Sequence, residues 1–462
     1  MQELNLGYHY PIIYWNTACL IINAGANEEL DDNKSTQYGK IAKAIANFKQ
    51  RSIIVDRPLI NEAKFSFVPD EKNNRIIFSF KGLCGIGDDI ARAIVEHQPY
   101  SSFEDFCKRM VDTKIIGTAK MIILIKAGCF NELDSPDRME TMKKFLSRNV
   151  FTPTDKLTMQ QFNSALEYDI FPKEMEIMIR IKNFKAYALH ESFFLKNIID
   201  EGKKVPKKGY HDRYFALDER GTEFLMEHFN TCIVGTKEDG VIISEKLFNK
   251  EWDALIQPLK DYMALPETLQ LYNQKKLDST MESYASGSLE QWDMESLSYY
   301  PDRHELWNLN EPKYGVVDYN SLPEIPEVYD YTTRRVRGEI KHFPKYKIFR
   351  LAGTVLDSDN NKHLVTLLTN YGVVTCKYNK GQYSYYNKRI SEQTPAGKKK
   401  VLEESWFKRG SKIIVCGYRR EDQFVVTKYA DTVYTHTTNR IEEIYSDGTI
   451  LAQTDRKKVG ED

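Results

Sequence analysis

The chain has 462 residues, of which 41% are hydrophobic and 28% are charged, and its formal net charge at pH 7 is −1. This length is enough for about three domains with hydrophobic cores. The start of the chain lacks a basic segment of the signal-peptide kind, and no apolar run approaches the ~20 residues of a membrane span. We therefore expect a cytoplasmic protein with no membrane partner.

The seven cysteines are scattered without a Cys-x-x-Cys pair, and the nine histidines show no metal-ligand spacing with them. Cysteines in this arrangement are typical of a reducing compartment. The sequence therefore predicts free thiols and no structural zinc.

The charge is unevenly distributed along the chain. Residues 251–328 hold 15 acidic and 5 basic side chains, whereas residues 341–430 hold 7 acidic and 18 basic side chains. This asymmetry indicates a nucleic-acid surface toward the C-terminal end.

Residues 1–70 are predicted to form one region, which begins with two helices. Residues 12–22 have the composition of a buried helix, and no domain precedes them to cover it, so we expect the chain to begin inside a fold. Residues 35–50 have the apolar spacing of an amphipathic helix. An extended segment over 53–69 and a short strand over 75–80 follow.

The pattern around which the chain is organised is Gly85-Ile86-Gly87, between two short segments of helical apolar spacing. Asp88 is the predicted cap of the second helix. Two glycines allow a tight turn whose backbone N–H groups face outward, and these donors suit a phosphate at the positive end of that helix. This is the helix-hairpin-helix pattern, which grips the DNA backbone without reading sequence. The alternative is a glycine turn between two packed helices.

The hairpin region is predicted to span residues 71–150 and to contain further helices over 102–110, 118–127 and 136–148. Lys114 and Lys120 are candidates for DNA contact in this region. The alternative for both lysines is a solvated face.

A mixed connecting region is predicted over residues 151–340, with its acidic part at 251–328. It contains a long helical pattern over 171–199 and a hairpin over 230–244, whose turn is Asp239-Gly240. Residues 322–328 are rich in proline and are predicted to be a linker.

Five strands are predicted in the last domain, residues 341–435, and they cover 347–356, 363–368, 373–378, 412–418 and 423–427. Five strands with a long insertion before the fourth indicate an OB-type β-barrel. Residues 436–462 are assigned to a tail. The predicted fold class is an α+β multidomain protein with a mainly helical N-terminal part, a helix-hairpin-helix and a C-terminal five-stranded OB-type β-barrel.

Basic and aromatic side chains are interleaved over the predicted barrel. Positive charge follows a phosphate chain, and aromatic rings stack on unpaired bases. The alternative is that half of the rings belong to the core and that the lysines are a solvated face. The predicted DNA-binding residues are Lys81, Gly85 and Gly87 at the hairpin, and Lys377, Tyr383, Tyr385, Lys388, Arg389, Lys398, Lys399, Lys400, Arg419 and Arg420 on the barrel.

Several segments match the motifs of one known family in the same order. They are His9-Tyr10-Pro11 and residues 56–61, 77–95, 100–107, 124–130, 295–299 with His304, 405–410 and 417–424. These segments resemble the alpha subunits of bacterial DNA polymerase III, the family C replicative DNA polymerases, in a version associated with phages of Gram-positive hosts. The resemblance covers residues 1–150 and 290–435, while the middle is recognised only by position. Cys84 stands where the family has a lysine, and Lys81 is expected to replace that phosphate contact in part.

The resemblance implies the C-terminal half of such a polymerase. Family C enzymes hold two Mg²⁺ ions on three palm aspartates, which lie upstream of the segment that matches His9-Tyr10-Pro11. The one Asp-x-Asp pattern of this chain, Asp357 and Asp359, is predicted to lie in a turn. We therefore assign no catalytic residue, no metal ligand and no cofactor to this chain, and expect Mg²⁺ on a separate polypeptide that carries the catalytic half.

Two functions remain open for the sequence. The first is the C-terminal portion of a DNA-directed DNA polymerase that acts in DNA replication only together with its catalytic half, with a sliding clamp as a further partner. No clean clamp-binding peptide is present, and residues 161–171, the nearest match, are predicted to be helix core.

The second is a non-enzymatic DNA-binding accessory protein of replication. The two differ at the N-terminus, because a polymerase half should expose apolar side chains for its other half. Those side chains are Ile12, Ile13, Trp15, Leu20 and Ile21. A stand-alone nuclease or ligase has no supporting motif.

Overall fold

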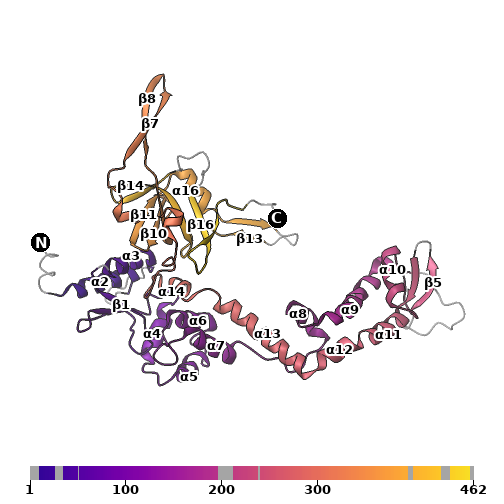
Figure 1. Ribbon diagram of the computed structural model, residues 1–462. Coiled ribbons are helices and arrows are strands. Elements are labelled where there is room, and N and C mark those ends of the chain that lie inside the picture. The colour runs from indigo at the N-terminus through magenta and orange to yellow at the C-terminus, as the bar shows by residue number, and fades with distance from the viewer. Residues whose placement is uncertain are drawn as a thin grey trace. The chain divides into compact units, whose positions relative to one another are not determined.

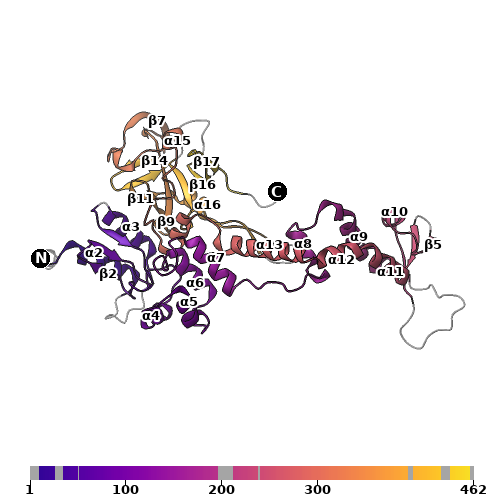
Figure 2. The same ribbon diagram turned by 60° about the horizontal axis from the view of Figure 1, so that its bottom comes forward.

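The computed structural model describes residues 10–26, 35–49, 51–195, 212–237, 240–393, 399–427 and 437–457. The chain forms two compact units: unit 1 consists of Met1–Phe145 together with Ala285–Asp462, and unit 2 is Leu146–Tyr284. Figures 1 and 2 show the elements of both units. None of the helices in the described ranges is long and apolar enough to cross a membrane.

Unit 1 begins with α2 (Ile12–Ala24) and α3 (Tyr38–Lys49), which confirm the first two predicted helices. The helices pack on each other and on a three-stranded sheet. In this sheet β3 (Arg75–Ile77) is central, parallel to β1 (Ile54–Asp56) and antiparallel to β2 (Val68–Asp70). The sheet leads directly into the glycine turn.

The hairpin region is a cluster of short helices around a phenylalanine-rich core. Its elements are α4 (Asp88–Glu96), α5 (Phe103–Phe106), the π-helix η1 (Cys107–Val111), α6 (Thr118–Ala127) and α7 (Arg138–Asn149). Phe106 and Phe130 pack edge to face at 5.0 Å between ring centroids, in the geometry that aromatic pairs prefer. The segment before Gly85 forms consecutive turns and not the short helix we expected.

A buried ion cluster joins this region to α14 (Leu289–Leu297), which packs on α6. The Asp293 carboxylate accepts two hydrogen bonds from Arg57, at 2.6 and 2.9 Å, and one of 2.5 Å from Arg138. Burial alone would lower the pKa of the Arg57 guanidinium, but its bonds to Asp293 keep that pKa above the ordinary value. Asp293 therefore holds residues that are far apart in the sequence in one core.

The C-terminal part of unit 1 contains a closed five-stranded barrel, which confirms the predicted OB-type architecture. Its strands are β9 (Phe349–Asp359), β10 (Leu364–Thr369), β11 (Gly372–Lys377), β14 (Lys412–Arg420) and β15 (Gln423–Val426). Neighbouring strands are antiparallel, except that β11 and β15 pair in parallel and, with the β14–β9 and β14–β15 pairs, close the ring. Trp406 and Phe424 fill its core.

Two segments of the region that we assigned to a tail are strands of the barrel sheet. β16 (Thr438–Ile444) pairs with β14, and β17 (Ile450–Gln453) pairs with β16. Beyond them Arg456 is 5% exposed and forms an ion pair of 2.6 Å with Glu403. The tail prediction was wrong for residues 438–456, because their apolar and charged side chains have partners on the barrel.

Two insertions depart from the barrel. Between β11 and β14 lie α16 (Lys380–Asn387), β12 (Ile390–Gln393) and β13 (Lys399–Glu403). Before β9, the strands β7 (Val328–Val336) and β8 (Glu339–Tyr346) form a separate two-stranded ribbon. The boundary that we expected after residue 340 falls inside β8, and the expected linker begins at Leu322, which is buried in the barrel core. The short α15 (Glu311–Tyr314) precedes the ribbon.

Unit 2 combines helices with a small antiparallel sheet of order β4-β6-β5. Its elements are α8 (Phe162–Glu167), α9 (Glu176–Ala188), β4 (Tyr214–Ala216), α10 (Glu219–His228), β5 (Ile233–Lys237), β6 (Gly240–Ser244), α11 (Glu245–Leu255), α12 (Gln257–Ala264) and α13 (Pro266–Ala285). The predicted hairpin is present as β5 and β6, although Asp239 of its turn lies outside the described residues.

Candidate nucleic-acid interface

The Gly85–Gly87 turn presents an uncapped helix N-terminus. Gly85 has φ +82°, which a residue with a Cβ adopts only at a cost, and Gly87 is the N-cap of α4 with no side-chain cap. A Cβ added at Gly87 would meet nothing within 4 Å, so the space in front of the helix is open. The N–H groups of the first turn of α4 are therefore accessible to an anion such as a phosphate.

Asp88 is not the cap that we predicted. It is the first residue of α4, and its carboxylate forms an ion pair with Lys81, whose side chain is only 13% exposed. Lys81 thus neutralises an acidic side chain next to the turn. Because the Lys81 ammonium group is paired with Asp88, Lys81 would have to leave this ion pair in order to bind a phosphate.

Cys84 faces the interior of unit 1. Its N–H donates to the Ser296 carbonyl at 2.8 Å, and its Sγ lies 2.9 Å from Oγ of Ser298. Burial raises the pKa of the Cys84 thiol, and nearby Arg409 offsets this in part. The thiol is therefore neutral at pH 7, and it anchors the turn to the end of α14.

Side chains from distant segments surround the open turn. The Tyr38 hydroxyl accepts a long hydrogen bond of 3.4 Å from the Gly85 N–H, and Lys120 donates to the Gly85 carbonyl at 2.6 Å. The Arg409 guanidinium lies over the Tyr38 ring, 4.6 Å from its centroid. Arg409, in the loop before β14, therefore lies beside the hairpin. The sequence alone did not indicate this proximity.

A second turn of the same kind begins α6. Gly117 has φ −84° and ψ 164°, close to the −82° and 165° of Gly87, and no side chain caps α6. Lys114, with φ +63°, takes the left-handed position shortly before Gly117 that Gly85 takes before Gly87. A Cβ at Gly117 would also meet nothing within 4 Å. The hairpin region thus has two exposed helix N-termini, of which our sequence analysis found one.

On the barrel, the predicted residues divide into exposed and buried ones. Tyr385 is 50% exposed, whereas Tyr383 is 3% exposed and packs on Phe407 and Tyr378. The expectation that Tyr383 stacks on a base was therefore wrong, because α16 turns its ring into the core. Lys388 is exposed, and Arg389 is exposed and paired with Glu404.

The remaining predicted barrel residues differ in their exposure and in their hydrogen-bond partners. The Arg419 guanidinium donates a hydrogen bond to the Leu322 carbonyl and forms an ion pair with Glu324. Arg420 is exposed and donates a hydrogen bond to the Tyr346 hydroxyl. Lys377 is half-buried and bonds the Lys362 carbonyl, and Lys400 is exposed. Lys398 and the side chain of Lys399 lie outside the described residues.

The outer face of strands β9 to β11, where many OB folds bind oligonucleotides, is partly covered in this chain. α3 packs on it so closely that a Cβ at Gly39 would lie 2.6 Å from the Asp357 Cβ. Leu356 of the barrel joins Ala42 and Tyr300 in one apolar cluster.

His304 fixes the segment after α14 to the same face. Its Nε2–H donates to the Leu368 carbonyl at 3.0 Å, and its Nδ1 accepts from the Leu306 N–H at 3.0 Å. Burial lowers the pKa of His304 to about 4, so the imidazole is neutral at pH 7. A bound strand would have to take another path over the barrel.

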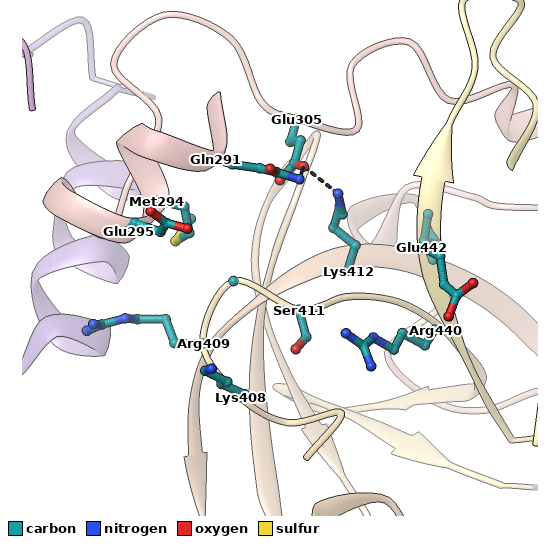
Figure 3. Close-up of a pocket in the computed structure, with 12 residues that line it drawn as sticks. Gln291, Met294, Glu295, Glu305, Lys408, Arg409, Ser411, Lys412, Arg440 and Glu442 are labelled. Carbon is teal, nitrogen blue, oxygen red and sulfur yellow. Dashed lines mark hydrogen bonds and ion pairs between the residues drawn. The ribbon is translucent and has the colours of Figure 1, made fainter. Parts of the chain in front are cut away.

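A cavity of about 760 Å³ lies between α14 and strands β14 and β16 (Figure 3). Lys408, Arg409 and Arg440 line it, and within the part of the chain that the structure describes none of the three has a carboxylate partner. Lys412 also lines the cavity, but it forms a buried ion pair with Glu305. Glu295 and Glu442 line the cavity too, so its walls carry both charges, and Arg409 also borders the hairpin.

The described residues contain no group of three or more His, Cys, Asp or Glu side chains that could hold a metal ion. The Asp-x-Asp pattern is used structurally, because Asp359 accepts the N–H groups of Asn361 and Lys362 at 2.9 Å. These hydrogen bonds lower the pKa of Asp359 against the effect of its desolvation. This pattern does not fit the Mg²⁺ site of a polymerase palm.

Comparisons with known proteins agree with a DNA-binding role. A family model described as the helix-hairpin-helix motif matches residues 52–140, which include both glycine turns. "Probable DNA polymerase YorL" of Bacillus subtilis strain 168 is 40% identical over 470 residues, which cover 99% of this chain and 34% of that protein. The "DNA-directed DNA polymerase" of Bacillus phage SPbeta matches with the same identity and coverage.

The chain is similar over nearly its whole length to DNA polymerases. It spans about a third of the length of these relatives. The helix-hairpin-helix prediction is confirmed by the matching family model.

Proposed function

We propose that this chain is the DNA-gripping portion of a family C DNA polymerase of the DNA polymerase III alpha type. Its two hairpins hold primer–template duplex, its barrel carries the single-stranded template, and nucleotidyl transfer takes place on a polypeptide that bears the palm aspartates and their Mg²⁺. The observation that carries the proposal is the pair of uncapped, glycine-started helices, α4 and α6, in a chain 40% identical to DNA polymerases.

The hairpins suit duplex because they bind through backbone N–H groups. Such donors contact phosphates and carry no base preference, as a replicative enzyme requires. Gly87 and Gly117 leave room for close approach, since neither position has an atom within 4 Å of an added Cβ. Lys120 and Arg409 would add positive charge beside the first turn.

For the single strand we propose the exposed insertion and the cavity of Figure 3 in place of the covered strand face. Tyr385 offers an exposed ring, and Lys388 and Lys400 offer exposed charge. In the cavity, Arg409 lies over the Tyr38 ring and so places a positive charge beside the hairpin. A strand that leaves the duplex at the hairpin would meet these cations first.

The N-terminal helix supports a contact with a catalytic polypeptide only in part. Ile12, Trp15 and Ile22 of α2 are each about half exposed or more, as a surface awaiting a partner would be. Ile13 and Leu20, which we expected to be exposed, are buried, because α2 packs on α3 and the small sheet. A clamp remains a proposed partner without assigned residues, since Phe162 of the nearest peptide is buried.

Primer extension tests the proposal. The chain is assayed alone and then mixed with the part of the phage SPbeta relative that it does not match. We expect extension only in the mixture, and weaker extension when the chain carries Gly87→Val and Gly117→Val. If the mixture fails to extend while the chain binds duplex, the non-enzymatic accessory function replaces this proposal.

A further inference from the structure

The β7–β8 ribbon is an arm without an assigned role. Among the strands of the described ranges, its two strands pair only with each other, and they extend away from the barrel (Figure 1). Nearly every side chain from Val328 to Lys345 is exposed. A two-stranded ribbon is at best marginally stable in water by itself, so a ligand that binds this arm would stabilise it.

The tip of the arm is strongly basic. Residues 334–341 contain four basic side chains and one acidic side chain. Arg334 lies directly opposite Lys341 in the register, and like charges at such positions destabilise a ribbon. Lys341 forms a long ion pair of 3.8 Å with Glu339, but across the described ranges no carboxylate pairs with Arg334, Arg335 or Arg337. An external anion would relieve this repulsion.

The turn at the tip keeps an arginine where the backbone disfavours one. Val336 and Glu339 close a two-residue turn in which Arg337 has φ +54° and Gly338 has φ +87°. This left-handed geometry favours Asn-Gly, and a residue with a larger side chain is strained there. An Asn at this position would make a less strained turn. Binding of an anion by the Arg337 guanidinium would offset the strain of the turn.

We propose that the arm binds the phosphate backbone of double-stranded DNA. The inference rests on the proposed function, because it assumes that duplex lies on this chain. A two-stranded ribbon fits the major groove. Successive strand residues point to opposite faces, so Arg334 with Lys341 on one face and Arg335 on the other can reach phosphates on both sides of the groove.

Variants of the tip test the proposal in the full chain. Arg337→Asn removes one cation while it improves the turn, and Arg334→Gln, Arg335→Gln and Arg337→Asn together remove three. The control is Lys246→Ala, Lys250→Ala and Lys275→Ala, which removes three exposed charges from unit 2. Binding of a fluorescent duplex is measured by anisotropy over a range of salt concentrations.

The logarithm of the binding constant falls as the logarithm of the salt concentration rises. We expect Arg337→Asn to make this slope less steep by about 0.9, and the triple variant by up to about 2.7. The triple variant should bind at least about tenfold more weakly at about 0.1 M salt. The thermal unfolding temperature of Arg337→Asn should not fall, and the control should bind as the original chain does.

Two outcomes overturn the proposal differently. If the arm variants keep the original slope while Gly87→Val weakens binding, the arm proposal fails alone, and an acidic protein becomes the better candidate ligand. If the original chain binds no duplex, both the arm proposal and the proposed function fail.

Discussion

The hairpin region and the barrel would hold DNA by different means. In the proposed interface the donors at the hairpins are backbone N–H groups, and the glycines that expose them, Gly85, Gly87 and Gly117, can be named from backbone geometry. On the barrel the donors are side chains, whose use depends on what packs around them, and Tyr383 and Tyr385 differ completely although they are two residues apart. Binding by backbone is fixed by local geometry, whereas binding by side chains is decided by tertiary packing.

The largest effect is expected from Asp293→Ala. The change leaves the buried Arg138 and the largely buried Arg57 without their shared carboxylate, and it should lower the free energy of unfolding of unit 1 by about 3–5 kcal/mol. Urea unfolding measures this. Asp302→Ala is the control, because Asp302 pairs with the same Arg57 but its side chain is 77% exposed, so its loss should cost less than about 1 kcal/mol. Equal costs would show that the cluster does not hold the hairpin region.

A smaller effect, on the barrel side, is expected from pH. The pKa of His304 is about 4 in the folded chain and about 6.5 when unfolded, so its contribution is fully present above pH 6.5 and is lost as the pH falls toward 4. Between pH 7 and pH 5 the loss should be about 2 kcal/mol. Thermal unfolding of the original chain and of His304→Gln at both values checks this, and an equal pH dependence in the two would contradict it.

The two glycines of the first hairpin separate binding from folding. Gly87 has an extended backbone and open space, so Gly87→Val should fold normally and weaken duplex binding about tenfold, or about 1.4 kcal/mol, by blocking the phosphate. Gly85→Val should also destabilise the fold by about 1–2 kcal/mol, because its φ is +82°. Unchanged duplex binding by Gly87→Val, measured by anisotropy, would remove the hairpin from the interface.

The smallest effect is expected from single lysines of the barrel. Lys400→Ala should lower the salt slope for single-stranded DNA by about 0.7, which is about threefold in affinity near 0.2 M salt. Lys408→Ala makes the matched comparison, because Lys408 lines the cavity of Figure 3. A slope that falls for Lys408→Ala and not for Lys400→Ala would place the strand in the cavity and away from the insertion.

Much of the architecture was predictable because it is local. Strand spacing and turn residues indicated the five-stranded barrel, and paired glycines indicated the first hairpin. The second hairpin was missed because Lys114 takes the left-handed position where a glycine is expected. Helical spacing could have shown that Tyr383 and Tyr386 share the buried face of α16, but the polar, glycine-containing context favoured a surface loop.

What could not be predicted depends on contacts between distant segments. Nothing in the sequence near Arg409 indicates that it reaches Tyr38, and nothing near Gly39 indicates that α3 covers the barrel face. The arm was missed because the predicted linker over 322–328 ends where β7 begins, and no strand was predicted before residue 347 in this part of the chain. Arg456 was assigned to a tail, since its partner Glu403 lies 53 residues earlier in the chain, and β16 likewise pairs with a separate strand, β14.

The Asp293 cluster also bears on the order in which the chain folds during synthesis. Arg57 and Arg138 leave the ribosome 236 and 155 residues before the carboxylate that neutralises them. Unit 2 is one continuous segment that is complete before Asp293 is made. Unit 2 can therefore fold during synthesis before unit 1 is complete. The ion cluster that joins Arg57 and Arg138 to α14 forms only after Asp293 has been made.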